Sequence, residues 1–103
     1  MMSGKPMKTN DFDATLAVFM KDQKLNAWHV ALLSAILVLG IRQGTKRSIK
    51  VSRSKLMALS HIKTLPTYHK YIKELQRFGY VIYRPSYHPG FRSEIDLTGN
   101  LSN

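Results

Sequence analysis

Basic side chains dominate the second half of this sequence. Between Arg42 and Arg92 there are twelve lysines and arginines and a single acid, Glu74. Before Arg42, four lysines and three aspartates nearly cancel. The net charge of +10 is therefore concentrated in one part of the chain. An excess of positive charge attracts a polyanion, so the chemistry predicted for this stretch is electrostatic binding of a nucleic acid.

A helix predicted over residues 64–78, with Thr64 as its N-terminal cap, carries the candidates for contacts with bases. Its apolar residues fall on one face, which would pack against the core. The opposite face presents hydrogen-bond donors, and the predicted contact residues are Thr64, Thr67, His69, Lys70, Lys73 and Arg77. Lys70 is suited to guanine O6 and N7, and Thr67 to a thymine methyl group. A merely solvated helix face is the alternative, but cations clustered around this helix favour contact with nucleic acid.

The start of a shorter helix, predicted over residues 53–60, is a candidate phosphate site. Ser52, Arg53 and Ser54 lie at its N-terminus, where free backbone N–H groups and the helix dipole attract an anion. Lys55 and Lys63 add positive charge around it. Plain capping of the helix by Ser52 is the alternative. Both roles are compatible, because a cap uses only one or two of the free donors.

The basic stretch ends in a predicted β-hairpin. Pro89-Gly90 lies between two segments of alternating polarity and predicts a type II turn. The candidate contacts with a nucleic-acid backbone or minor groove are Arg84, Tyr87, His88 and Arg92. Packing of Tyr87 and Phe91 back onto the hairpin is an equally good interpretation of these two aromatic residues.

Neither catalysis nor metal binding is predicted. The sequence has no cysteine. Its four histidines are His29, His61, His69 and His88. They fall on four different predicted elements, without the i, i+4 spacing or the carboxylates of a metal site. Tyr68 and Tyr71 have the helical spacing of core residues, and no acid, base or nucleophile accompanies them. We therefore expect no enzyme activity, no metal and no cofactor.

The elements that would position these residues give an α+β fold in a single domain. Apolar periodicity and capping residues predict helices over about residues 11–22, 26–43, 53–60 and 64–78. Alternating polarity predicts short strands over residues 48–51, 80–84 and 92–97. The expected domain spans residues 10–97, between flexible tails at residues 1–9 and 98–103.

The second predicted helix is apolar nearly all round and has Gly44 as its stop signal. One apolar stripe begins with Trp28 and another ends with Ile41. Such a helix either lies at the centre of the fold or buries its second face against another subunit, so a monomer and a homodimer are both open. Its apolar run, residues 30–41, is shorter than the ~20 residues that a membrane-spanning helix needs.

Three segments carry a resemblance to a known motif: the run from Ser52 to Ser60, the run from Thr67 to Leu75, and Phe78-Gly79-Tyr80-Val81. They resemble the winged helix-turn-helix of bacterial regulators of the GntR and MarR types. The resemblance covers residues 48–97. It implies a three-helix core with a small antiparallel sheet, whose hairpin is the wing, plus an N-terminal helix. It also implies that the helix starting near residue 64 is the recognition helix.

The whole chain resembles small winged-helix proteins carried on bacterial mobile elements, which implies a role in excision, transfer or replication control. Too few residues precede the motif to form an effector domain, so no small-molecule effector is expected. The motif departs from that of the larger regulators at Leu65-Pro66, where the recognition helix begins.

We therefore expect a double-stranded DNA-binding protein with sequence preference, acting as a small transcriptional regulator or a recombination or excision accessory factor. Its expected location is the cytoplasm, in association with the nucleoid, and no membrane partner is expected. A homodimer would suit a two-fold DNA site. The alternatives are a basic RNA-binding module, and an adaptor of a replication or transfer machine that binds an acidic protein partner.

Overall fold

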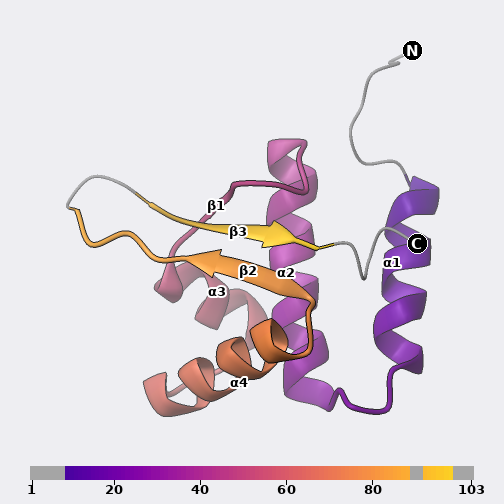
Figure 1. Cartoon of the computed structure of the whole chain (residues 1–103), viewed down its shortest axis with the longest axis horizontal. Coiled ribbons are helices and arrows are strands. Elements are labelled where there is room, and N and C mark those ends of the chain that lie inside the picture. The colour runs from indigo at the N-terminus through magenta and orange to yellow at the C-terminus, as the bar shows by residue number, and fades with distance from the viewer. Residues whose placement is uncertain (1–8, 89–91, 99–103) are drawn as a thin grey trace.

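The computed structural model describes residues 9–88 and 92–98, which form an α+β domain (Figure 1). The helices are α1 (Thr9–Lys21), α2 (Ala27–Gln43), α3 (Arg53–Ser60) and α4 (Leu65–Arg77). The strands are β1 (Ile49–Val51), β2 (Val81–Arg84) and β3 (Ser93–Leu97). They form an antiparallel sheet in the order β1-β3-β2. The predicted α+β class and order of elements are confirmed.

Side chains at the start of α2 explain why this helix begins where the sequence predicted. The Asn26 side-chain oxygen accepts the backbone N–H of Trp28 at 2.9 Å and that of His29 at 3.2 Å. In return, His29 Nδ1 accepts the backbone N–H of Asn26 at 2.9 Å. The helix ends at Gly44, whose φ of 74° lies in the left-handed region that favours glycine.

The ends of α3 and α4 show one correct and one wrong cap prediction. Ser52 Oγ accepts the backbone N–H of Lys55 at 3.2 Å, which confirms the predicted cap of α3. Thr64 occupies the capping position of α4, but its hydroxyl makes no bond to the helix backbone. It donates instead to the Thr67 hydroxyl at 2.9 Å, so its predicted role as a side-chain cap is wrong.

Most boundaries lie within a residue or two of the predicted ones. Helix α1 begins at Thr9, two residues before the prediction, and each strand is shorter by one residue. Thr98 was predicted to begin the C-terminal tail, but it is attached to the domain, because its backbone N–H donates to the Tyr80 carbonyl at 3.1 Å. The Pro89-Gly90 turn and Phe91 lie outside the described residues, as does the rest of both predicted tails.

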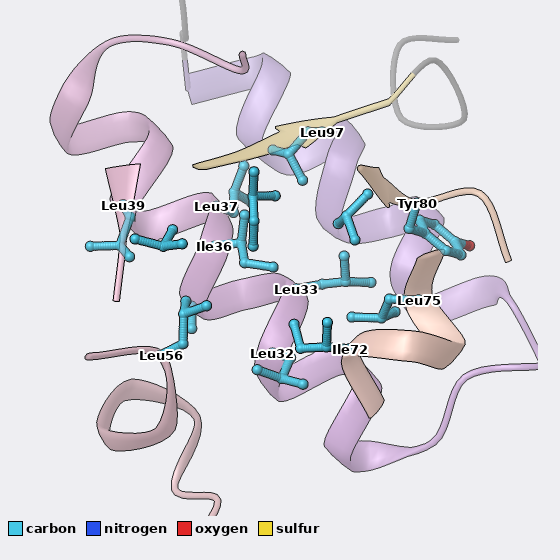
Figure 2. Packing of buried hydrophobic residues seen from close by; sticks show 14 of the residues in the cluster. Leu32, Leu33, Ile36, Leu37, Leu39, Leu56, Ile72, Leu75, Tyr80 and Leu97 are labelled. Atoms are coloured by element: carbon cyan, nitrogen blue, oxygen red, sulfur yellow. The ribbon is translucent and has the colours of Figure 1, made fainter. Parts of the chain in front are cut away.

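Helix α2 lies at the centre of the fold, and α1, α3, α4 and β1 all contact it. Its side chains form the middle of the buried cluster in Figure 2, where Leu32, Leu33, Ile36 and Leu37 are fully buried. The apolar character of this helix on nearly all sides is thus largely accounted for within one chain. Trp28 and Ile41 are the exceptions, with exposed fractions of 41% and 38%.

Helix α1 lies on the side of α2 opposite the outer end of the β2–β3 hairpin (Figure 1). Phe19, which is 1% exposed, packs edge-on against the Tyr80 ring with centroids 6.1 Å apart. The Tyr80 hydroxyl donates to an Asp22 carboxylate oxygen just after α1. These contacts attach α1 to the rest of the domain near the start of β2.

The two faces of the sheet have different compositions. Cross-strand partners place Ile49 beside Ile95 and Val81 beside Leu97, and all four are buried against the helices. The next positions along the strands point to the outer face because side chains alternate in a β-strand. These outer positions are Lys50, Ile82, Arg84, Glu94 and Asp96. The alternation therefore separates charged strand residues from the core.

Candidate nucleic-acid interface

Helix α4 carries most of the residues predicted to contact bases. Tyr68, Tyr71, Ile72 and Leu75 are buried and fix one face of the helix against the core. The structure exposes five of the six predicted contact residues on this helix and its cap, namely Thr64, His69, Lys70, Lys73 and Arg77, and leaves Thr67 half-buried. The amphipathic pattern thus produces one anchored face and one cationic face, as predicted.

Glu74, the acid of α4, is used inside the fold. Its Oε1 lies 2.7 Å from Nε2 of His29, which is 3% exposed. Because His29 Nδ1 already accepts the Asn26 N–H, the proton of a neutral ring is on Nε2 and is donated to Glu74. Arg77 Nη2 lies 4.0 Å from the other carboxylate oxygen. This acid therefore binds α4 to α2, and Arg77 is the one exposed α4 cation that forms an ion pair with it.

Further cations come from α3 and from the turn that joins it to α4. Arg53, Ser54 and Lys55 are exposed in the first turn of α3, and Lys63 is exposed just before α4. Ile62 is 2% exposed and anchors the turn. We call the following six residues the α3–α4 cations: Arg53, Lys55, Lys63, Lys70, Lys73 and Arg77. Apart from Arg77, none of them forms an ion pair with a carboxylate of the described residues.

A groove of about 670 Å³ separates α4 from the β2–β3 hairpin. We call it the α4–hairpin groove. Its cationic and polar lining comes from Arg53 at the start of α3 and from His69, Lys73 and Gln76 of α4. Its aromatic lining comes from Tyr83 and Tyr87. The fold thus brings together predicted contact residues from α3, α4 and the hairpin, while Lys55, Lys63, Lys70 and Arg77 lie outside the groove.

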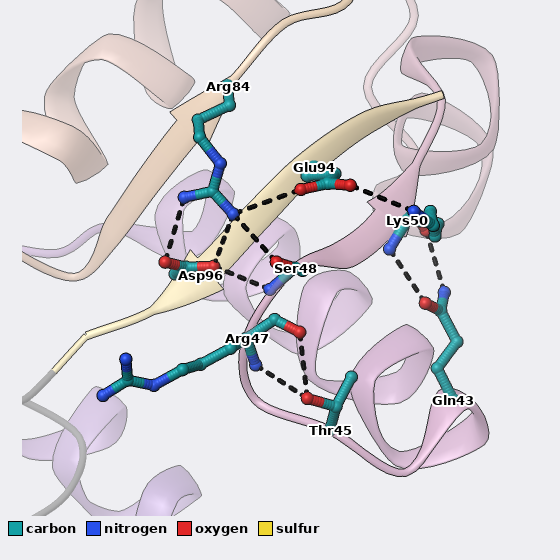
Figure 3. A network of polar contacts seen from close by, with 8 residues as sticks. All are labelled: Gln43, Thr45, Arg47, Ser48, Lys50, Arg84, Glu94 and Asp96. Atoms are coloured by element: carbon teal, nitrogen blue, oxygen red, sulfur yellow. Dashed lines mark hydrogen bonds and ion pairs between the residues drawn. The ribbon is translucent and has the colours of Figure 1, made fainter. Parts of the chain in front are cut away.

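The outer face of the sheet holds a network of ion pairs (Figure 3). The Arg84 guanidinium donates to Asp96 at 2.8 and 3.0 Å, to the Ser48 hydroxyl at 3.1 Å and to Glu94 at 3.3 Å. Lys50 Nζ reaches the other Glu94 oxygen at 3.0 Å. We call these residues, with Gln43, the outer sheet network; Gln43 joins it through two 2.8 Å bonds to the Lys50 backbone.

The network perturbs the titration of its members. Hydrogen bonds from Arg84 and from the Ser48 backbone lower the pKa of Asp96 to about 2, from an ordinary value of 3.8. The bonds from Lys50 and Arg84 also lower the pKa of Glu94. The phosphate contact predicted for Arg84 is not favoured by this geometry, because its guanidinium already pairs with two carboxylates. The reason is the strand register, which sets Arg84 opposite Glu94.

The end of the hairpin presents the other predicted contact residues. Tyr87, His88 and Arg92 are all exposed. Tyr87 is 87% exposed, so it does not pack back onto the hairpin, and that interpretation is wrong for this residue. Phe91 lies outside the described residues.

The histidines do not gather in one place. Within residues 9–88 and 92–98, no three histidine, aspartate or glutamate side chains are arranged to hold a metal ion. His29 is buried in α2, His61 occupies the left-handed end of α3 with φ of 63°, and His69 lines the groove. No helix of the described part of the chain has the length and apolarity needed to cross a bilayer.

Two features of this region escaped the sequence analysis. Gln76 and Tyr83 line the groove and were not predicted as site residues. Gln76 lies one and two helical turns after Lys73 and His69, so helical spacing could have identified it. Tyr83 could be found only from the packing of β2 against α4, because its strand position alone also fits a core residue. Comparisons with protein-family models, with curated proteins and with solved structures gave no significant match.

Proposed function

We propose that this protein is a winged-helix domain that binds double-stranded DNA, with α3 and α4 as the helix-turn-helix and the β2–β3 hairpin as the wing. In this arrangement α4 enters a major groove, and Arg53 and Arg92 contact the flanking backbone. The four residues between α3 and α4, with buried Ile62 among them, fit the tight turn of such a motif. Sequence-preferring regulation, or assistance in recombination or excision, is the proposed role.

One observation carries this proposal: within the described residues, the fold pairs Lys50 and Arg84 of the sheet with carboxylates and leaves all but one of the α3–α4 cations without such a partner. Lys50 and Arg84 pair with Glu94 and Asp96, whereas five of the six α3–α4 cations form no ion pair among the described residues. When unpaired, exposed lysines and arginines contact DNA phosphates, the counterions condensed on the DNA are released, and this release favours binding. The charge available for DNA is therefore concentrated on the helices that would read it.

The side chains of α4 also suit base contacts. His69 and Lys70 are exposed donors in the first half of the helix, which is the part that approaches base edges in helix-turn-helix proteins, and Lys73 is exposed one turn further along. Thr64 and Thr67 are hydrogen-bonded to one another, so they are less available than the sequence suggested. We assign discrimination between bases mainly to Lys70, and a phosphate contact to Lys73. A homodimer on a two-fold site and a nucleoid location are part of the same proposal.

Selection from random duplex DNA at physiological salt tests the proposal. We expect enrichment of a short motif, and a two-fold repeat of it if the protein binds as a dimer. Binding of the selected duplex should weaken by about 10³- to 10⁵-fold between roughly 50 and 200 mM salt, as for 6–10 phosphate contacts. Duplex RNA of the same length is the control. A flat salt response, or preference for the RNA, would reject the proposal.

A further inference from the structure

The α4–hairpin groove has a composition that DNA-backbone contact alone does not require. It combines Arg53, His69 and Lys73 with the aromatic rings of Tyr83 and Tyr87. Within the part of the chain that the structure describes, no carboxylate lines the groove. Its volume of about 670 Å³ lies within the range of small-ligand sites, roughly 300–1,000 Å³. The groove thus offers one wall that attracts an anion and another that can stack against a planar ring.

A buried polar group lies next to two residues of the groove lining. The Tyr68 side chain is fully buried, and its hydroxyl has no hydrogen-bond partner within the described residues. Burial and the nearby Tyr83 raise the pKa of Tyr68, and Arg53 is also close to it. Tyr83 and Arg53 both line the groove. Because Tyr68 is fully buried and is absent from the groove lining, it packs behind the wall formed by Tyr83 and does not itself meet a ligand.

We propose that the α4–hairpin groove holds one unpaired nucleotide of the bound DNA, with its phosphate at Arg53 and Lys73 and its base against Tyr87. This inference rests on the proposed function and names a preferred substrate, a duplex that carries an unpaired base. Cations track a nucleic-acid backbone, and aromatic side chains stack on bases of any sequence. A base that enters the groove must leave the helical stack, and this costs least when the base is already unpaired.

The exposure and charge of the groove residues indicate which of them would contact the base and which the phosphate. Tyr87 is 87% exposed, so a base can reach its ring without rearrangement of the core. Tyr83 is half-buried and forms the wall behind it. Lys73 is exposed in the middle of α4 and faces the groove, whereas Lys63 carries the same charge outside the groove. Lys63 is therefore the matched control for Lys73.

Fluorescence anisotropy with three labelled DNAs tests the proposal: a plain duplex, the same duplex with one extra unpaired thymidine, and the same duplex with an abasic residue at that place. We expect the thymidine bulge to bind at least about 5-fold more tightly than the plain duplex, and the abasic bulge to lose most of this gain. Tyr87→Ala should remove the preference, and Tyr87→Phe should keep it. Lys73→Gln should reduce the preference, whereas Lys63→Gln should weaken all three DNAs equally.

The outcomes separate this inference from the proposed function. Equal binding of the plain and bulged duplexes, or an equal loss for both in Tyr87→Ala, would overturn the groove proposal alone. Tight binding of thymidine monophosphate without any bulge preference would assign the groove to a free nucleotide and also overturn it. Failure to bind any of the three DNAs would reject the proposed function, and the groove proposal with it.

Discussion

The α3–α4 cations and the two cations of the outer sheet network, Lys50 and Arg84, all come from the basic half of the sequence, yet the fold uses them in opposite ways. Arg84 and Lys50 are held by Glu94 and Asp96. The two helices that carry most of the α3–α4 cations have a single acid, Glu74, and this acid is bonded to the buried His29. A count of charges in the sequence treats both sets alike. The comparison teaches that the position of the acids, more than that of the cations, defines where a polyanion can bind.

Reversing charge on the helical face is expected to have the largest effect. The double variant Lys70→Glu/Lys73→Glu should weaken duplex binding by roughly 100-fold, because two attractive contacts become repulsive. Its stability should be close to that of the wild type, since both side chains are exposed. Anisotropy titrations and thermal unfolding measure the two quantities. Undiminished binding would show that α4 does not face the DNA.

The bond between His29 and Glu74 holds the acid of α4 inside the fold. Loss of this bond should lower the stability of the protein. In His29→Ala, Asn26 loses its reciprocal acceptor and Glu74 loses a buried donor 2.7 Å away. We expect a loss of about 2 kcal/mol in the free energy of unfolding, measured with urea. Glu74→Gln, which keeps an acceptor for His29, should cost less. If the His29→Ala variant were as stable as the wild type, the bond between His29 and Glu74 would not contribute to the stability of the fold.

The outer sheet network should matter least for binding and should appear in the pH dependence of stability. Because the pKa of Asp96 is lowered to about 2 in the folded protein, the unfolded chain binds this proton first as the pH falls. The stabilisation is therefore complete above about pH 4 and is lost as the pH falls towards 2. Arg84→Ala should flatten this part of the stability profile.

The same variant should change duplex affinity by less than about 2-fold, because Arg84 is occupied by carboxylates. Lys73→Ala is the converse control, with weakened binding and an unchanged acid profile. Affinity loss in Arg84→Ala equal to that in Lys73→Ala would show that the ion pairs open when DNA binds. Urea unfolding from neutral pH to pH 2 and anisotropy titrations together make the comparison.

Local signals in the sequence predicted most of the helices and strands. Asn26 and Gly44 set the limits of α2, and Ser52 begins α3, because each satisfies or tolerates what a helix end requires. The buried and exposed faces of α4 followed from its apolar spacing. Thr64 was a miss, since the Thr67 hydroxyl offers a competing partner that a capping rule does not consider.

The candidate site was predictable residue by residue but not as an arrangement. Lys70 and Lys73 could be assigned to an exposed helical face, because exposure depends on spacing along one helix. The partners of Arg84 could not be assigned, because they depend on strands β2 and β3 pairing in one particular register. Gln76 and Tyr83 joined the site only through the packing of the hairpin against α4.

The sequence by itself determined the helices, the turns and the excess of positive charge, because these depend on neighbours within a few residues. Only the tertiary structure decided which of the cations stay unpaired. The pairing of Arg84 with Asp96 and of Glu74 with His29 joins residues 12 and 45 positions apart. Such pairs exist only after the strands align and α4 packs on α2, because an ion pair forms only between side chains within a few ångströms of one another.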